Sequence, residues 1–178
     1  MGAVRAFDPV CLVMGVLSTR PDRNQELFDL LSEHFGKIRE VTDAVPFTFT
    51  GYYDEEMGGR PLRFFIVFEH LFDPSVLAKL KAETNDMEKL FAEDGKRKIN
   101  LDPGILSADN FILATTKDRS HRVPLSDGMY AEVTLMYANG QFNALPWTYA
   151  DYRSDAFRAL FKRFRQEYLQ QLRTVLKQ

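Results

Sequence analysis

The sequence has a single cysteine, Cys11, so an internal disulfide is excluded. Cys11 stands in an apolar run, where a small buried side chain is expected rather than a reactive thiol. This usage fits a reducing, cytoplasmic compartment. Cysteine pairs for zinc are missing too, and the three histidines, His34, His70 and His121, are too scattered for a metal-binding spacing. We therefore predict no metal site.

Long apolar runs and an excess of one charge are also absent. No run approaches the roughly 20 residues that a membrane-spanning helix needs, and the first residues do not resemble a signal peptide. The net charge of -2 gives no general attraction to nucleic acid. We therefore expect neither a membrane nor a nucleic acid as partner.

Three common sequence motifs are missing. The chain has no G-x-x-x-x-G-K-[ST] loop for phosphates, no G-x-G-x-x-G for dinucleotides and no G-x-S-x-G nucleophile turn. These absences exclude the usual nucleotide-binding sites and the hydrolases that use this nucleophile turn. They do not exclude a site assembled from several strands. The identity of any cofactor stays open.

The composition of the chain indicates one globular domain over residues 1–178. The apolar share of 45% and the aromatic share of 13% suffice for a sizeable core. No repeat or linker divides the chain. Within this domain we distinguish a first half (1–102), a second section (103–150) and a terminal helix (151–178).

Strands and helices alternate in the first half. Asp73-Pro74 starts a helix, since Asp caps a helix N-terminus and Pro fits its first position. Gly36 and Gly95 end helices. The order βαββαβ is that of ferredoxin-like sheets. The expected extended segments are 10–17, 37–41, 47–53, 62–68 and 98–101, and the helices start near residues 27 and 74.

The second section is rich in strands, expected at 111–116, 122–125, 129–137 and 141–145. Asn139-Gly140 indicates a hairpin, because both residues tolerate positive φ. A helix over 154–176 follows, with one apolar stripe and one basic face. The predicted fold is α+β, a ferredoxin-like βαββαβ core extended by an antiparallel β-meander and a long C-terminal helix.

Polar residues that suggest a site begin at the end of the first half. In a strand at 98–101, Ile99 and Leu101 face one side, so Asn100 and Asp102 face the other. These two side chains could lie at the mouth of a site. They could equally belong to a solvated edge followed by a turn at Asp102-Pro103-Gly104.

The segment 115–122 combines cations, a carboxylate, hydroxyls and an imidazole. Lys117 and Arg122 could bind an anion, and Asp118 could orient His121 as an acid or base. The alternative is a polar hairpin loop whose charges are incidental. A lone histidine is weak evidence for catalysis.

The strand near residue 132 carries a carboxylate in its middle. Its odd-numbered residues from Met129 to Leu135 form an apolar face, which puts Tyr130, Glu132 and Thr134 on the other. If this polar face is covered, Glu132 needs one of the two cations just named. The alternative is that this polar face of the sheet is exposed to solvent.

Aromatic residues gather just before the terminal helix. The only tryptophan, Trp147, stands two residues before Tyr149. The two rings could wall a pocket and stack on a planar ligand. Alternatively they fix the loop onto the start of the helix.

Taken together, these segments resemble the prokaryotic family grouped as domain of unknown function 4416. The resemblance covers almost the whole chain, and the order of its motifs is specific. It implies no activity that can be transferred. The residues that carry it are 13–18, 47–50, 52–53, 100–104, 114–118, 121–122, 130–135, 146–149 and 151–152.

These observations favour a site for an anionic small molecule, phosphorylated or nucleotide-like. Whether the protein is an enzyme stays open; an activity would be acid/base or hydrolytic, through His121, Glu132 and Asp118. A non-enzymatic interaction or homo-oligomerisation module is the alternative, and RNA binding is the third hypothesis. The expected ligand-binding residues are Lys117, Arg122, Asn100, Asp102, Tyr130, Thr134, Trp147 and Tyr149.

Overall fold

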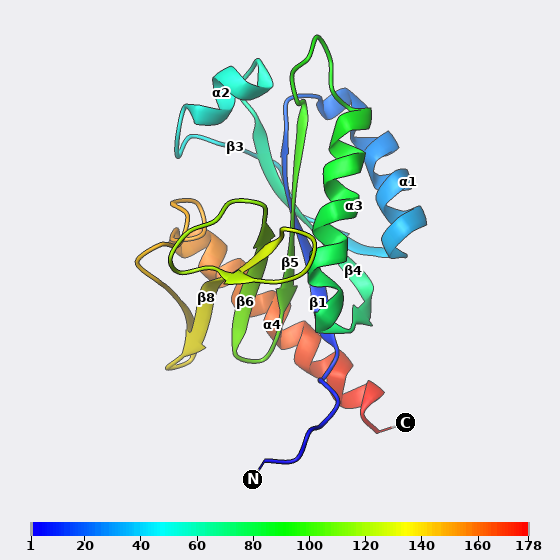
Figure 1. Ribbon diagram of the computed structural model, residues 1–178, viewed down its shortest axis with the longest axis vertical. Coiled ribbons are helices and arrows are strands. Elements are labelled where there is room, and N and C mark those ends of the chain that lie inside the picture. Colours follow the sequence, from blue (N-terminus) through cyan, green and yellow to red (C-terminus); the bar gives the residue numbers. More distant parts are fainter. Residues whose placement is uncertain (1, 178) are drawn as a thin grey trace.

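The computed structural model describes residues 2–177 as one large antiparallel sheet with helices on both faces (Figure 1). The strands are β1 (Val10–Ser18), β2 (Ile38–Val41), β3 (Val45–Pro46), β4 (Leu62–Phe72), β5 (Ile99–Leu106), β6 (Asn110–Thr115), β7 (Val123–Pro124), β8 (Tyr130–Ala138) and β9 (Gln141–Ala144). The helices are α1 (Asn24–Phe35), α2 (Tyr52–Met57), α3 (Leu77–Leu90) and α4 (Asp155–Val175), with short 3-10 turns at Pro21–Arg23 and Pro74–Val76.

The central strand β1 is buried along its whole length, as its continuous apolar run predicts. Its even-numbered residues, such as Leu12 and Met14, pack with α1 and α3. Its odd-numbered residues, Cys11 and Val13, pack with α4 on the opposite face. Burial raises the pKa of the Cys11 thiol to about 12, which fits the expected structural role of this residue.

The strand order is β2-β4-β1-β5-β6-β8-β7, with β3 on β4 and β9 on β8. Every pair is antiparallel. The predicted α+β class, antiparallel sheet and C-terminal helix are therefore confirmed. The ferredoxin-like assignment of the first half stays a prediction.

Two local predictions follow simple sequence rules and are confirmed. Asn139 and Gly140 have φ of 54° and 79°, and they join β8 to β9 in a hairpin. Asp73 caps the 3-10 turn at Pro74–Val76 that leads into α3, because its carboxylate accepts a hydrogen bond from the backbone N–H of Ser75 at 2.8 Å. Within residues 2–177, no helix is both long enough and apolar enough to cross a membrane.

The predicted strand at 47–53 is wrong. Only Val45–Pro46 pairs with β4, and α2 begins at Tyr52. The ring of Phe47 lies 5.6 Å from both Phe49 and Tyr53, between ring centroids. The alternation of aromatic and threonine residues here therefore reflects a cluster of rings within a loop, not one face of a sheet.

For the segment after Leu101, the alternative of a solvated edge followed by a turn at Asp102-Pro103-Gly104 is also wrong. β5 continues through these residues to Leu106, in register with β1. Proline fits this position because β6 pairs with β5 only from Gly104 onward, so Pro103 has a neighbouring strand on one side alone.

A bulge corrects the predicted faces of β8. Glu132 pairs with Leu113, but the register then shifts so that Leu135 pairs with Phe111. One extra residue on β8 turns the following side chains to the other face. Leu135 therefore packs against α4 on the same face as Glu132, rather than on the opposite one.

A salt bridge ties the edge strand β2 to α4 and should make stability depend on pH. Arg163 contacts Glu40 at 2.9 and 2.5 Å and holds the pKa of that carboxyl below its usual range. A lowered folded-state pKa contributes stability above the ordinary carboxyl pKa of about 4.3, and this is lost as the pH falls through the folded value.

We expect a coupling free energy between Glu40 and Arg163 of at most about 1 kcal/mol near neutral pH, because both side chains are partly exposed. It should approach zero near about pH 3. Urea unfolding of Glu40→Gln, Arg163→Gln and the double variant at both pH values measures it. An equal coupling at both would contradict this explanation.

Candidate functional site

The sheet opens between β5 and β6, and a pocket of about 360 Å³ lies there. The two strands pair only from Gly104 to Leu106, so the first half of β5 has no neighbour on that side. Figure 1 shows α2 on one side of this opening and the β6–β8 half of the sheet on the other. The pocket has a charged floor, two polar walls and an aromatic wall.

The floor is formed around Arg63 of β4. This guanidinium is 4% exposed, and its Nη2 lies 2.8 Å from Asp151 Oδ2 while its Nη1 lies 3.6 Å from Asp102 Oδ2. Its Nε and Nη1 atoms have no hydrogen-bond partner, and neither does the buried hydroxyl of Tyr152. The floor thus holds polar atoms that a bound molecule could satisfy.

Gly15 of β1 makes room for these floor residues. A β-carbon at this position would lie 2.8 Å from the Tyr152 hydroxyl and 3.0 Å from Arg63 Nη1. Burial opposes the charge on Arg63, but Tyr152 and the two carboxylates raise the pKa of Arg63 above its ordinary value. Burial also raises the pKa of Asp151 and that of Tyr152.

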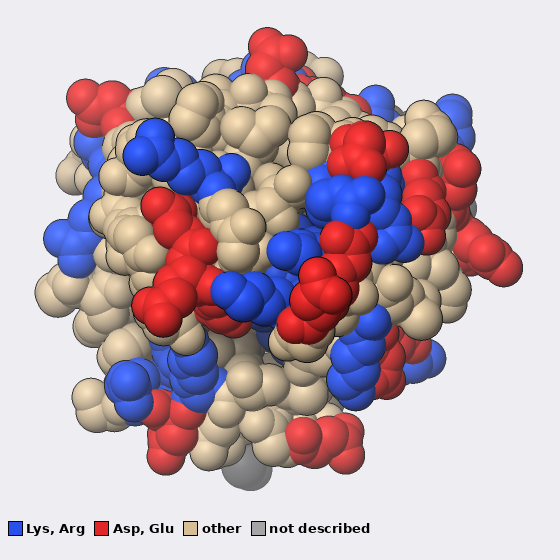
Figure 2. Space-filling view, turned by 90° about the horizontal axis from the view of Figure 1, so that it is seen from above, with Lys and Arg blue, Asp and Glu red and all other residues tan. Residues whose placement is uncertain are grey.

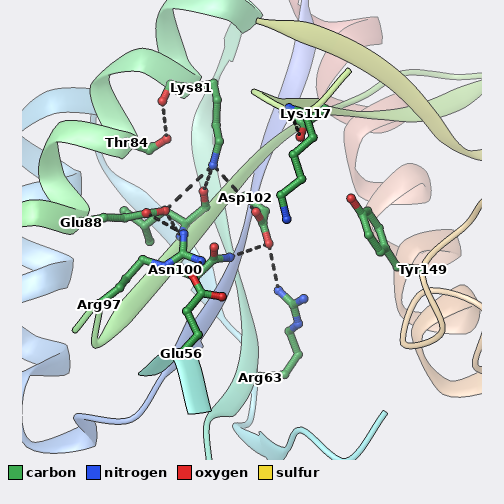
Figure 3. Close-up of polar contacts among 12 residues, drawn as sticks. Glu56, Arg63, Lys81, Thr84, Glu88, Arg97, Asn100, Asp102, Lys117 and Tyr149 are labelled. Atoms are coloured by element: carbon green, nitrogen blue, oxygen red, sulfur yellow. Dashed lines mark hydrogen bonds and ion pairs between the residues drawn. The ribbon is translucent and has the colours of Figure 1, made fainter. Parts of the chain in front are cut away.

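The first polar wall joins α3 to the open edge of β5 (Figure 3). Lys81 Nζ donates to the backbone oxygen of Leu101 at 2.7 Å and lies 3.8 Å from Asp102 Oδ1. Asn100 donates to Asp102 Oδ2 at 2.8 Å. The unpaired edge is thereby satisfied by side chains, and Asp102 is held at the centre of the wall.

Glu88 and Arg97 support this wall. Glu88 accepts from the backbone N–H of Leu101 at 2.7 Å and from Arg97 at 2.9 Å. Arg97 also pairs with Glu56 of α2. The contacts connect α3, β5 and α2 and fix the position of each around the pocket.

The second polar wall comes from the end of β6, from β8 and from the loop before α4. It presents Lys117, Glu132 and Tyr149. Behind it, Arg122 Nε lies 2.7 Å and His121 Nε2 lies 2.9 Å from the same oxygen of Glu132. This covered carboxylate thus has the cation partner that the sequence requires, in Arg122 rather than Lys117.

The aromatic wall is the segment 47–53, which the sequence predicts as a strand and which is a loop followed by the start of α2. Phe47, Phe49, Tyr52 and Tyr53 line the pocket, and Lys117 Nζ lies 5.5 Å from the centroid of the Tyr52 ring. These rings can stack on a planar group. Among residues 2–177, no three His, Cys, Asp or Glu side chains are arranged to hold a metal ion.

The structure brings some of the predicted site residues together and separates others. Those that line the pocket are Asn100, Asp102, Lys117, Glu132 and Tyr149. His121 and Arg122 stand behind it on Glu132, and Trp147 stacks on His121 with ring centroids 4.9 Å apart. Asp118, Tyr130 and Thr134 do not line it.

Two predicted roles are corrected by these positions. His121 is held by Glu132 and not by Asp118, whose described hydrogen bond uses only its backbone oxygen. Trp147 does not form the stacking wall, because its ring packs on His121 and its Nε1 donates to the backbone of Val133 at 2.8 Å. The rings available to a ligand are Tyr149 and those of the loop near Phe47.

Sequence reasoning missed Arg63 and Lys81. Each leaves a trace in the sequence, because Arg63 interrupts the apolar run of β4 and Lys81 follows Leu77 by four residues on the buried side of α3. A charge at a core position needs a partner or a function. For Asp151 and Tyr152, the sequence offers only their place among the residues that carry the family resemblance.

Comparison with known proteins gives one match. The family described as "Domain of unknown function (DUF4416)" matches residues 8–168, a span that contains every residue lining the pocket. Comparison with curated proteins gives no match, and comparison with solved structures gives none either. The match covers most of the chain, and the protein therefore belongs to the DUF4416 family.

Proposed function

We propose that the pocket binds a small molecule with an anionic group, phosphorylated or nucleotide-like. The observation that carries this proposal is a cluster of three cationic side chains, Arg63, Lys81 and Lys117, around Asp102 (Figure 3). A second negative group supplied by a ligand would complement this cluster.

Lys117 is the cation most available to the ligand. Arg63 is paired with Asp151, and Lys81 donates to the backbone of β5. Among residues 2–177 no carboxylate lies within salt-bridge distance of Lys117, and its ammonium group points toward Asp102 in Figure 3. Thr115 and Thr116 line the pocket beside it and can supply hydroxyl donors.

The shape and surface of the pocket favour a small ligand over a polymer. Its volume lies within the range of about 300–1,000 Å³ that is typical of small-molecule sites. Figure 2 shows that acidic and basic side chains are intermixed over the face seen from above. A nucleic acid would need a continuous basic surface instead.

We propose binding as the primary role of the pocket. Of the three residues that the sequence predicts for catalysis, His121 and Asp118 do not line it. Acid/base or hydrolytic turnover would therefore rest on Glu132 or Asp102. A single free and buried cysteine, Cys11, fits a protein of the reducing cytoplasm.

Replacing Lys117 by alanine should weaken binding of a phosphate-bearing ligand about tenfold or more, because a charge-assisted hydrogen bond contributes about 1.5–3 kcal/mol. A thermal-shift screen with inorganic phosphate, nucleoside monophosphates and sugar phosphates would select the probe, and calorimetry would measure its Kd. The unfolding temperature without ligand should change little, because Lys117 is exposed and its described charge contact is with the Tyr52 ring.

Lys79→Ala is the matched control, because Lys79 is an exposed lysine that does not line the pocket. It should bind the probe as the unmodified protein does. The proposal is wrong if no anion of the screen stabilises the protein, or if the Lys117 and Lys79 variants bind equally well.

A further inference from the structure

Glu132 is the pocket carboxylate whose side-chain partners, Arg122 and His121, come from outside the pocket. The residue is 1% exposed and lines the pocket from β8. Its Oε2 atom makes both contacts, with Arg122 Nε at 2.7 Å and His121 Nε2 at 2.9 Å. Neither Arg122 nor His121 lines the pocket.

The second carboxylate oxygen of Glu132, Oε1, is buried and makes no hydrogen bond. A buried acceptor without a donor costs roughly 1–3 kcal/mol or more when it is charged, and it is seldom retained without a reason. Both partners behind the wall contact Oε2, so neither of them occupies Oε1, and Glu132 lines the pocket.

The other two carboxylates of the pocket have charged partners within the pocket, although Asp151 Oδ2 is also buried without a hydrogen bond. Asp102 accepts from Asn100 at 2.8 Å, and Asp151 lies 2.8 Å from Arg63. Those partners line the pocket themselves. The charges of the floor are thus balanced within the site, whereas Glu132 presents an acceptor with no cation of the pocket assigned to it.

Several contacts fix the orientation of Glu132. Arg122 also donates to the backbone oxygen of Lys117 at 2.7 Å and to the Tyr149 hydroxyl at 2.9 Å. The imidazole of His121 lies parallel to the Trp147 ring, with 12° between their planes. Arg122, His121 and Trp147 are therefore positioning residues that hold one carboxylate at the pocket wall.

We propose that Glu132 recognises a nitrogen donor of the ligand, either an ammonium group or the amino group of a heterocycle. An ionised carboxylate only accepts hydrogen bonds, so its partner must be a donor. The ligand class of the site is then an anion that also carries an N–H group. The inference rests on the proposed binding of an anion beside Lys117 and adds a second, separately testable contact.

Two pairs of compounds that differ only in the amino group test this inference. One pair is O-phosphoethanolamine and ethyl phosphate, and the other is adenosine 5′-monophosphate and purine riboside 5′-monophosphate. Calorimetry on the full chain would give each Kd. In at least one pair, the amino compound should bind about tenfold or more tightly, as expected for a charge-assisted hydrogen bond.

In Glu132→Gln this preference should shrink to about twofold or less, while the partner without the amino group binds as before. Glu55→Gln removes an exposed carboxylate outside the pocket and should keep the full preference. If Glu132→Gln does not fold, Glu132→Asp retains the charge beside Arg122 but withdraws it from the ligand, and the same loss of preference is expected.

Each outcome decides the inference. Equal binding within both pairs by the unmodified protein, with weakening of all four by Lys117→Ala, overturns the role of Glu132 and leaves the anion site standing. A preference that persists in the Glu132 variants assigns the amino group to another residue and also overturns it. Binding of none of the four compounds removes the proposed function together with this inference.

Discussion

Replacing Arg63 by methionine should lower the free energy of unfolding by about 3–5 kcal/mol, the usual cost of removing one partner of a buried ion pair. Asp151 is 2% exposed and lies 2.8 Å from the guanidinium, so the variant leaves this carboxylate buried without its cation. Asp102 also loses a cation at 3.6 Å. Urea unfolding followed by circular dichroism measures the change.

Two further variants separate the lost ion pair from the lost packing. Arg60→Met removes an exposed arginine from the segment before β4 and should change stability by less than about 0.5 kcal/mol. Adding Asp151→Asn to Arg63→Met should recover part of the loss, because the buried charge is removed as well. An Arg63→Met protein as stable as the Arg60→Met control would refute this account of the floor.

Replacing Gly104 by alanine should destabilise the protein by about 2–3 kcal/mol, at the upper end of the usual cost of overpacking. The added β-carbon would lie 2.2 Å from Cζ of Phe111 and 3.1 Å from a methyl of Leu113. The Phe111 ring is fully buried and lies 4.5 Å from the Phe161 ring, between centroids, so it has little freedom to move. The shift of the urea midpoint measures the effect.

Gly51→Ala is the matched control, because a β-carbon at Gly51 meets nothing within 4 Å and its φ is -82°. It should leave stability nearly unchanged. Shortening the opposing side chain in a Gly104→Ala/Phe111→Leu double variant should give a favourable coupling between the two sites. Additive losses in the double variant would show that the contact with Phe111 is not the cause.

The variants Arg63→Met and Gly104→Ala should also affect the pocket. Arg63 forms its floor, and Gly104 stands at the last pair of β5 and β6 before the strands separate. Loss of stability in these variants should therefore be accompanied by weaker binding of the anion probe. Lys117→Ala and the Glu132 variants instead change the contacts with the ligand itself. For Lys117→Ala, the loss of binding should appear without a matching loss of stability.

Alternation along strands predicts correctly that certain polar side chains share one face. Asn100 and Asp102 lie on the same face of β5, and both line the pocket. Glu132 has the basic partner that a covered carboxylate needs. Such statements depend only on the two-residue repeat of a strand and on the cost of burying a charge.

Contacts between distant segments could not be predicted in this way. Asp118 is close to His121 in sequence, yet Glu132 is the residue that contacts it in the fold. Arg63 meets Asp151 across 88 positions of the chain, and no local pattern specifies which carboxylate it reaches. The bulge in β8 likewise depends on its pairing with β6, not on its own residues alone.

The sequence by itself determined the buried central strand, the Asn139-Gly140 hairpin, the Asp73 cap and the α+β class, because each follows from periodicity or turn chemistry within a few residues. Only the tertiary structure decided where the pocket lies. It opens where β6 stops pairing with β5 at Gly104, and it is closed by side chains from β4, α3 and the loop before α4. Asp102 and Lys117, which the sequence predicts as site residues, line this pocket together with Arg63 and Lys81 from earlier in the chain.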